Sequence, residues 1–240
     1  MCGKFTIQMT WREYCDLAGT RTDGGDGSAS DVLAPETELM TMTPSRLVPV
    51  LHLGPVRQRR ISAMRWGWHK NSAADPMRSF SHLHVRAETI DSAPTWIDSF
   101  HERRGVIFTR AFNIGEELPN GKIKQWVCSR EDKAPVAIAV IFETREYIQG
   151  KLTAFAMITT ESCAPLNGRD SMRPARRDLD EVPKWIGETA ATSPELKAML
   201  RPYSGFLVMR EQQPAKPKAE RNTTRARPKP ARDADQTDLF

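Results

Sequence analysis

Apolar and β-branched residues occur along this chain in short runs, without a long stretch of helical period. Pro, Gly, Asn or charged residues bound these runs, as is typical of strands that end in turns. None approaches the roughly 20 apolar residues that a membrane-spanning helix needs. We expect six strands, at Leu47–Leu53, Arg60–Trp68, Gly105–Phe112, Ile123–Ser129, Val136–Phe142 and Thr153–Thr160.

Helical patterns are fewer than strand patterns. We expect helices at Thr10–Leu17, Leu179–Ile186 and Ser193–Leu200. In the last of these, Ser193 is expected as the N-cap and Pro194 as the first helical residue. Strands that do not alternate regularly with helices predict an α+β domain built around a curved, mostly antiparallel sheet.

The composition adds a polar appendage to this domain. The 240 residues are 39% hydrophobic, and the mean hydropathy is −0.52. Residues 210–235 are rich in Lys, Arg and Pro, so we expect a disordered basic linker after a domain at residues 2–209. Thr22–Ser30 is expected to be a mobile surface loop. The net charge of +5 weakly favours an anionic partner.

The cysteines and the N-terminal segment limit the class of protein. The four cysteines are scattered without a CxxC pair, so we expect no zinc site and no cofactor. No signal-peptide pattern follows Met1. We expect a monomeric, soluble, cytoplasmic protein with reduced thiols. The cysteines are Cys2, Cys15, Cys128 and Cys163.

Cys2 is the first candidate for chemistry. Its small side chain permits removal of Met1, which would leave an α-amine and a thiol on adjacent carbons. The α-amine has an ordinary pKa near 7.7–8.0 and the thiol one near 8.5, so both groups are partly nucleophilic near neutral pH. Together they can condense with an aldehyde to a thiazolidine ring, and an abasic deoxyribose offers such an aldehyde. The alternative is an inert small residue at position 2.

Six segments stand in a fixed order within residues 2–187 and resemble known motifs. They are similar, in order, to the MCGRF, APT, RWG, ARAET, RRC and TTEA motifs of the SOS response-associated peptidase family. Each motif alone is weak, whereas the ordered set is specific. The segments are Cys2–Phe5, Met42–Ser45, Met64–Trp68, Val85–Thr89, Arg103-Arg104 and Thr159–Glu161.

The resemblance implies a single compact domain around a pseudo-barrel sheet with peripheral helices, and Cys2 at the base of a basic cleft. Members of this family bind single-stranded DNA, form a thiazolidine crosslink to abasic sites, and are credited with autoproteolytic trimming. Carried onto this chain, Cys2 is the nucleophile. The implied DNA-binding residues are Lys4, Pro44, Arg65, Trp66, Arg86 and Thr160. Lys4 and Arg86 would contact phosphate, and for Trp66 or Trp68 core packing is the competing interpretation.

Three departures from the family pattern fall on catalytic positions. The family Asn before the ARAET Arg is His84 here, and the catalytic Glu of its GFYEW motif aligns with Ile114. The motif that supplies a catalytic His has become Asp170–Pro174. His84 could replace the lost acid/base group, since an imidazole titrates near 6.5. Glu116 or Glu117 could also do so, although a solvated turn is the simpler interpretation of that pair.

The last five residues resemble the peptide with which bacterial repair proteins dock on the β sliding clamp. Leu239 and Phe240 would fill an apolar pocket, and Gln236 would hydrogen-bond at its rim. The alternative is a chance C-terminus.

Two functions therefore compete. The first is abasic-site processing in single-stranded DNA by Cys2-dependent covalent crosslinking. The second is a catalytically impaired single-stranded DNA-binding paralogue that the tail tethers to the sliding clamp.

Overall fold

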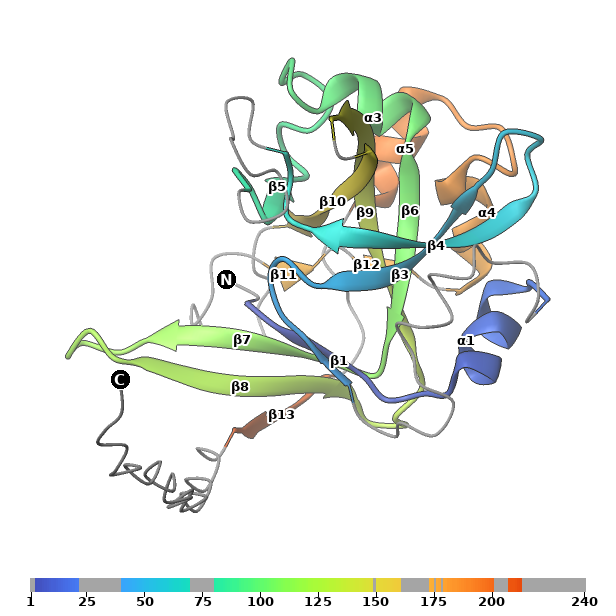
Figure 1. Ribbon diagram of the computed structural model, residues 1–240. Helices are drawn as coiled ribbons and strands as arrows, with labels where there is room; N and C mark the ends of the chain where they lie inside the picture. The colour runs from blue at the N-terminus through green and yellow to red at the C-terminus, as the bar shows by residue number, and fades with distance from the viewer. Residues whose placement is uncertain are drawn as a thin grey trace, which may run out of the picture.

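The computed structural model describes residues 3–21, 40–69, 80–148, 150–160, 173–174, 176–177, 179–200 and 207–212. Figure 1 shows these residues as helices and strands coloured along the chain. The expected loop at Thr22–Ser30 and the expected clamp peptide lie outside the described residues.

Five of the described strands close into a mixed barrel. Around the barrel the order is β10-β4-β3-β6-β9, and β9 pairs with β10 to complete the circle. Strands β10 and β4 are parallel, whereas the other neighbours are antiparallel. This arrangement confirms the predicted α+β class and the curved, mostly antiparallel sheet. The barrel strands are β3 (Leu47–Leu53), β4 (Arg59–Trp66), β6 (Arg104–Thr109), β9 (Val136–Tyr147) and β10 (Gly150–Thr160).

Three further short strands extend the barrel sheet. Strand β5 runs parallel to the last part of β10, while β11 and β12 pair antiparallel with β10 and β9. These additions are β5 (His84–Arg86), β11 (Arg173–Pro174) and β12 (Arg176–Arg177).

A second sheet lies beside the barrel and is antiparallel throughout, in the order β13-β8-β7-β1-β2. In Figure 1, β7 and β8 extend away from the barrel as a long hairpin. The hairpin reverses at Leu118–Gly121, where the Gly121 N–H donates to the Leu118 carbonyl at 2.8 Å. The strands are β1 (Phe5–Ile7), β2 (Met40–Met42), β7 (Ala111–Glu117), β8 (Ile123–Arg130) and β13 (Leu207–Glu211).

The two sheets are joined by a break in what the sequence predicts as one strand. The expected run Gly105–Phe112 divides at Arg110, because β6 ends at Thr109 in the barrel and β7 begins at Ala111 in the second sheet. The Thr109 hydroxyl donates to the Ala111 carbonyl at 2.9 Å and stabilises the crossing. Hydrophobicity alone does not reveal such a break, since both halves are apolar.

The helices cover the outside of the barrel. The N-cap of α1 (Trp11–Ala18) is Thr10, in a reciprocal capping box with Glu13. Gly19 ends α1 in the left-handed conformation, with φ of 62°. The other helices are α3 (Ile97–Glu102), the 3₁₀ turn η2 (Leu179–Glu181), α4 (Val182–Ile186) and α5 (Ser193–Met199).

The expected cap of the last helix needs a correction. Thr192, rather than Ser193, is the N-cap, with an extended backbone (φ −78°, ψ 159°) and a side chain that accepts from the Glu195 N–H. The Glu195 carboxylate in turn accepts from the Thr192 N–H at 2.7 Å. Thr192 and Glu195 have capping-box spacing, and that spacing decides between two adjacent hydroxyl residues.

Buried aromatic and aliphatic side chains from both sheets form one core. Tyr14 fastens α1 to it, since its buried hydroxyl donates to the Pro49 carbonyl at 2.5 Å and accepts from the Phe108 N–H at 3.2 Å. None of the described helices is long and apolar enough to span a membrane. The expected linker start at Arg210 is also corrected, because β13 continues to Glu211.

Candidate active site

Strand β1 brings the N-terminal segment to the junction of the two sheets. Phe5 pairs with Met42 on one side and Phe112 on the other. Its ring lies 5.2 Å from the Trp66 ring of the barrel. Gly3 continues this strand toward the N-terminus, whereas Cys2 lies outside the described residues.

The register of β1 and β7 places Ile114 beside Gly3. The Asn113 N–H donates to the Lys4 carbonyl at 3.0 Å, so the following residue of β7 lies next to the preceding residue of the N-terminal segment. Ile114 is fully buried in the core. The position at which the family resemblance implies a catalytic carboxylate is therefore apolar.

Trp66 forms the barrel side of this junction and is fully buried. Its ring stacks on Phe155 at 6.4 Å and meets His84 edge-on at 6.0 Å. The indole N–H donates to the Leu83 carbonyl at 3.1 Å. Trp66 is thus a core residue under the site and offers no exposed ring face for a base. Trp68 is also buried.

Strand β5 supplies the polar side of the junction. His84 and Arg86 lie on one face of β5, paired in register with Met157 and Thr159 of β10. Arg86 is exposed and has no ion-pair or hydrogen-bond partner among the described residues. Its guanidinium is therefore available to an anion.

Thr160 lies on the other side of β10. Side chains alternate along a strand, so Thr159, rather than Thr160, shares a face with Arg86. The buried Thr160 hydroxyl has no hydrogen-bond partner among the described residues. The sequence motif includes both threonines at the end of β10 but cannot tell which of them shares a face with Arg86.

Pro44 lies in a tight turn against Trp66. The Arg46 N–H donates to the Thr43 carbonyl at 3.2 Å, and Ser45 has a φ of 68°. A proline followed by a residue of positive φ is the pattern of a type II turn. The Ser45 N–H donates to the Trp66 carbonyl at 2.8 Å and attaches the turn to β4. Pro44 therefore borders the same junction as β1.

Two of the expected DNA-binding residues, Arg65 and Lys4, are not gathered with Arg86. Arg65 is fully buried, and its charge acts on His69 on the opposite side of β4 from Trp66. The expected DNA contact of Arg65 is therefore wrong for this conformation. Phe5 faces Trp66, so alternation directs Lys4 to the opposite face of the second sheet.

Glu116 and Glu117 lie in the last part of β7, before the hairpin turn. The Glu116 carboxylate accepts from the Trp126 indole N–H at 2.7 Å. Lys124 lies 4.5 Å above the Trp126 ring. Glu116 is thus held within the sheet rather than in a solvated turn, and Glu117 is exposed at the strand end.

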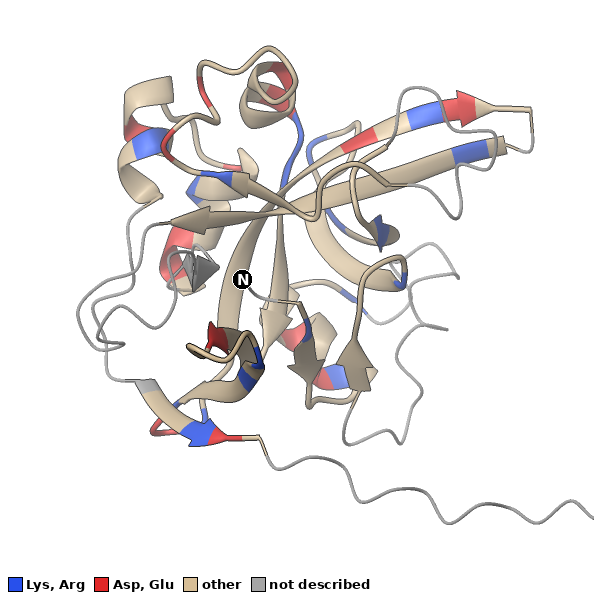
Figure 2. Ribbon diagram, turned by 90° about the vertical axis from the view of Figure 1, so that its left-hand side faces the viewer, with Lys and Arg blue, Asp and Glu red and all other residues tan. Residues whose placement is uncertain are grey.

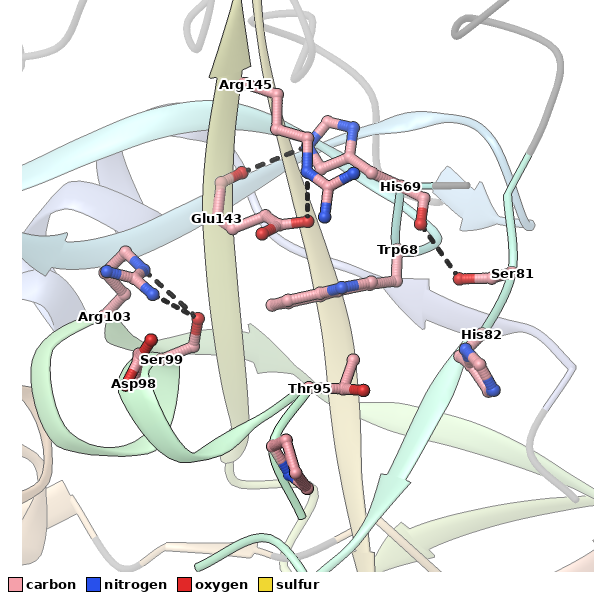
Figure 3. A pocket seen from close by; sticks show the side chains of 11 residues that line it. Trp68, His69, Ser81, His82, Thr95, Asp98, Ser99, Arg103, Glu143 and Arg145 are labelled. Atoms are coloured by element: carbon pink, nitrogen blue, oxygen red, sulfur yellow. Dashed lines mark hydrogen bonds and ion pairs between the residues drawn. The ribbon is translucent and has the colours of Figure 1, made fainter. Parts of the chain in front are cut away.

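A separate cavity of about 460 Å³ lies between α3 and the ends of β4 and β9. Figure 3 shows several of its polar side chains joined by hydrogen bonds and ion pairs. Arg145 pairs with Glu143 at 2.8 Å, and the Arg103 guanidinium donates twice to Ser99. Arg145 and Arg103 are thus already engaged by neighbours within the cavity.

His69 in this cavity predicts a pH-dependent stability. Its Nε2–H donates to the Glu143 carbonyl at 3.3 Å, and Nδ1 lies 2.9 Å from the Tyr147 hydroxyl. Burial, aided by the charges of Arg145 and Arg65, lowers the pKa of His69 to about 4. The unfolded chain therefore binds the extra proton first, and stability is lost as pH falls from 6.5 toward 4.

As pH falls from 8 to 5, protonation linked to His69 alone should lower the free energy of unfolding by about 2 kcal/mol. Urea unfolding at both pH values measures the loss. A His69→Gln variant should lack this part of the pH dependence, and an equal loss in that variant would contradict the assignment to His69.

Comparison with known proteins decides the family. A family model described as SOS response associated peptidase (SRAP) matches residues 1–214. The chain belongs to the SRAP family. This membership associates it with the SOS response and DNA damage. Among the curated proteins compared with the chain, none matches.

Solved structures show the same fold at low identity. A Bordetella bronchiseptica protein is 16% identical, with a TM-score of 0.67, covering 88% of this chain and all of that one. A Bacteroides thetaiotaomicron protein is 13% identical, with a TM-score of 0.68, covering 88% of this chain and 92% of that one. A phage-related protein from Bordetella bronchiseptica is 14% identical, with a TM-score of 0.67 and coverage of 89% and 95%. These similarities confirm the expected SRAP fold.

Some expected site residues of this SRAP chain lie outside the described residues. They are Cys2, Asp170–Met172 in the altered His motif, and the clamp-peptide residues Gln236, Leu239 and Phe240. Within the described residues, no group of His, Cys, Asp or Glu could hold a metal ion.

Trp126 and Lys124 are site neighbours that sequence reasoning missed, because only the β7–β8 register places them opposite Ile114 and Glu116.

Proposed function

We propose that this SRAP protein binds single-stranded DNA and that Cys2, after removal of Met1, forms a covalent crosslink with abasic sites. The observation that carries the proposal is the position of Gly3, next to Cys2. It continues β1 at the junction where Phe5 meets the Trp66 and His84 cluster. Arg86 lies on the same face of β5 as His84 and is free to hold a phosphate.

The chemistry needs only the two groups of an N-terminal cysteine. The α-amine adds to the aldehyde of the ring-opened sugar, and loss of one water gives an imine. The thiolate then adds to the imine carbon, while the nitrogen takes up a proton, and the five-membered thiazolidine ring closes. The product mass is the sum of protein and DNA less one water.

Proton transfer would come from His84 or from Glu116. His84 shares its strand face with Arg86, so it can lie near a sugar whose phosphate Arg86 holds. Glu116 lies two residues beyond Ile114 on the same face of β7, and its bond to Trp126 orients the carboxylate. Glu117 can serve only if the exposed strand end turns toward the site.

The buried Ile114 favours a second function. A chain without the family carboxylate could retain DNA binding without catalysis. In that case it would act as a single-stranded DNA-binding paralogue, with its C-terminal peptide docked on the sliding clamp.

A crosslinking assay tests the first function against the second. The protein is incubated with a single-stranded oligonucleotide that carries one abasic site and is run on a denaturing gel. We expect a shifted covalent band that disappears in Cys2→Ala. A matched oligonucleotide with tetrahydrofuran, which has no aldehyde, should bind equally well and give no covalent band.

The mass of the product identifies the linkage. Intact mass spectrometry should show loss of Met1 and a product lighter by one water than its components. Noncovalent binding without any band would support the paralogue, and a band that persists in Cys2→Ala would exclude the thiazolidine.

A further inference from the structure

A groove of about 500 Å³ lies on the outer face of the second sheet, away from Phe5 and Trp66. Its floor is made of small side chains from three adjacent strands, and its rim carries cations. In Figure 2, the positions of Lys and Arg are blue and those of Asp and Glu are red, including those of the second sheet. The lining residues are Gln8, Arg110, Ala111, Val127, Ser129, Arg130, Glu131, Lys133, Val208 and Arg210.

Arg110 is fixed at one side of the groove. Its Nε donates to the Gln8 carbonyl and its Nη1 to the Lys133 carbonyl, each at 2.9 Å. The nearest carboxylate to its Nη2 is that of Glu13, at 3.8 Å. Neutral carbonyls thus fix the guanidinium at the side of the groove, and its ion pair with Glu13 is long.

Of the other three cations of the groove, one is ion-paired and two have no such partner among the described residues. Arg130 is paired with Asp132, whose pKa its hydrogen bonds lower to about 2. Lys133 and Arg210 are exposed and have no ion-pair or hydrogen-bond partner for their side chains among the described residues. Glu131 is the one carboxylate among the described lining residues. The groove therefore favours an anion.

The groove continues the surface that carries the N-terminal segment. Lys4 and Gln8 lie on the same face and are four residues apart, which is about 14 Å in extended chain. The chain also leaves the sheet beside Arg210, and residues 213–232 carry seven Lys or Arg and one Glu. The sequence that follows β13 is thus rich in positive charge.

We infer that this groove is a second nucleic-acid site, which holds the phosphate backbone of single-stranded DNA flanking the segment bound at the Cys2 junction. Lys133, Arg210 and Arg110 contact phosphates, and Ala111, Val127 and Val208 give an apolar floor for sugar or base. The inference rests on the proposed DNA binding but adds a site distinct from the Cys2 junction.

The salt dependence of binding tests the groove. In the full chain, Lys133→Gln with Arg210→Gln removes two cations and preserves side-chain length. Titration with a fluorescent 30-mer without abasic sites should give a slope of log K against log salt that is smaller in magnitude by about 1.4. At 0.15 M salt this corresponds to roughly tenfold weaker binding.

A matched control loses the same charge elsewhere. Lys151→Gln with Lys184→Gln removes two cations that pair with Glu146 and Glu195, away from the groove. We expect its slope to stay that of the unsubstituted protein. An unchanged slope in the groove variant, or an equal loss in both variants, would overturn the second site. Thermal melts of both variants must match that of the unsubstituted protein, and a Lys133→Arg, Arg210→Lys variant should keep the slope.

Two further measurements separate this site from the proposed function and from a protein ligand. Crosslinking to a short abasic oligonucleotide that occupies only the Cys2 junction should be the same in the groove variant and the unsubstituted protein. Loss of that crosslink would place Lys133 and Arg210 in the junction reaction and overturn a separate site. Polyglutamate that binds the unsubstituted protein but not the groove variant, while both bind DNA equally, would identify an acidic-peptide site instead and also overturn the inference.

Discussion

An Ile114→Glu variant is expected to crosslink abasic single-stranded DNA about 10- to 100-fold faster than the unsubstituted protein. The β1–β7 register places residue 114 beside Gly3, so a carboxylate there would lie beside the residue that follows Cys2, the proposed nucleophile. General acid–base catalysis typically contributes about 10²–10⁴-fold, and the apolar surroundings of Ile114 should reduce the gain by raising the carboxyl pKa. Single-turnover gel kinetics with excess protein measure the rate.

The matched control is Ile114→Gln, which has nearly the same shape and cannot transfer a proton. It should crosslink no faster than the unsubstituted protein. Burying a carboxyl in place of Ile114 costs several kcal/mol of stability, on the order of 2–5, so urea unfolding must show that the variant is folded at the assay temperature. A folded Ile114→Glu with no gain, or an equal gain in Ile114→Gln, would contradict the role of this position.

Long strands were predictable from the sequence, and short ones were not. Leu47–Leu53 was predicted with the bounds that β3 has, because five Leu and Val residues lie in this run between turn signals. Strand β1 has three residues, Phe5–Ile7, and exists because β2 and β7 pair with both of its edges. A pattern of three residues contains too little information to predict a strand, since the pairing partners lie far along the chain.

The candidate site was predictable as a set of chain positions but not as a set of facing side chains. The motifs fall on β4 and β5, yet Arg65 and Trp66 point to opposite sides of β4. Alternation along a strand gives the relative faces, but only the fold determines which face meets the N-terminal segment. For the same reason, the motif could not show that Trp66 is covered by Phe5 and Phe155.

A Trp66→Ala variant should therefore act mainly through stability. The side chain is fully buried, and its indole contacts Phe5, Phe155 and His84. Removing so large a buried ring typically costs about 3–5 kcal/mol. Urea unfolding should show this loss. Because Phe5 loses its support beside Gly3, crosslinking by the fraction that remains folded should also slow.

A Trp66→Phe variant distinguishes support of the site from direct contact with DNA. It keeps an aromatic ring against Phe5 and Phe155 but loses the hydrogen bond to the Leu83 carbonyl, which should cost about 1–2 kcal/mol. If Trp66 supports the site from below, the affinity of Trp66→Phe for single-stranded DNA should equal that of the unsubstituted protein. A residue that stacks on a base would give a different result, since loss of base stacking weakens binding by about 1–3 kcal/mol per base. The affinity of Trp66→Ala, measured at a temperature where this variant is folded, would then fall by that amount, and Trp66→Phe would restore part of it. Such a result would show that the indole face reaches the DNA.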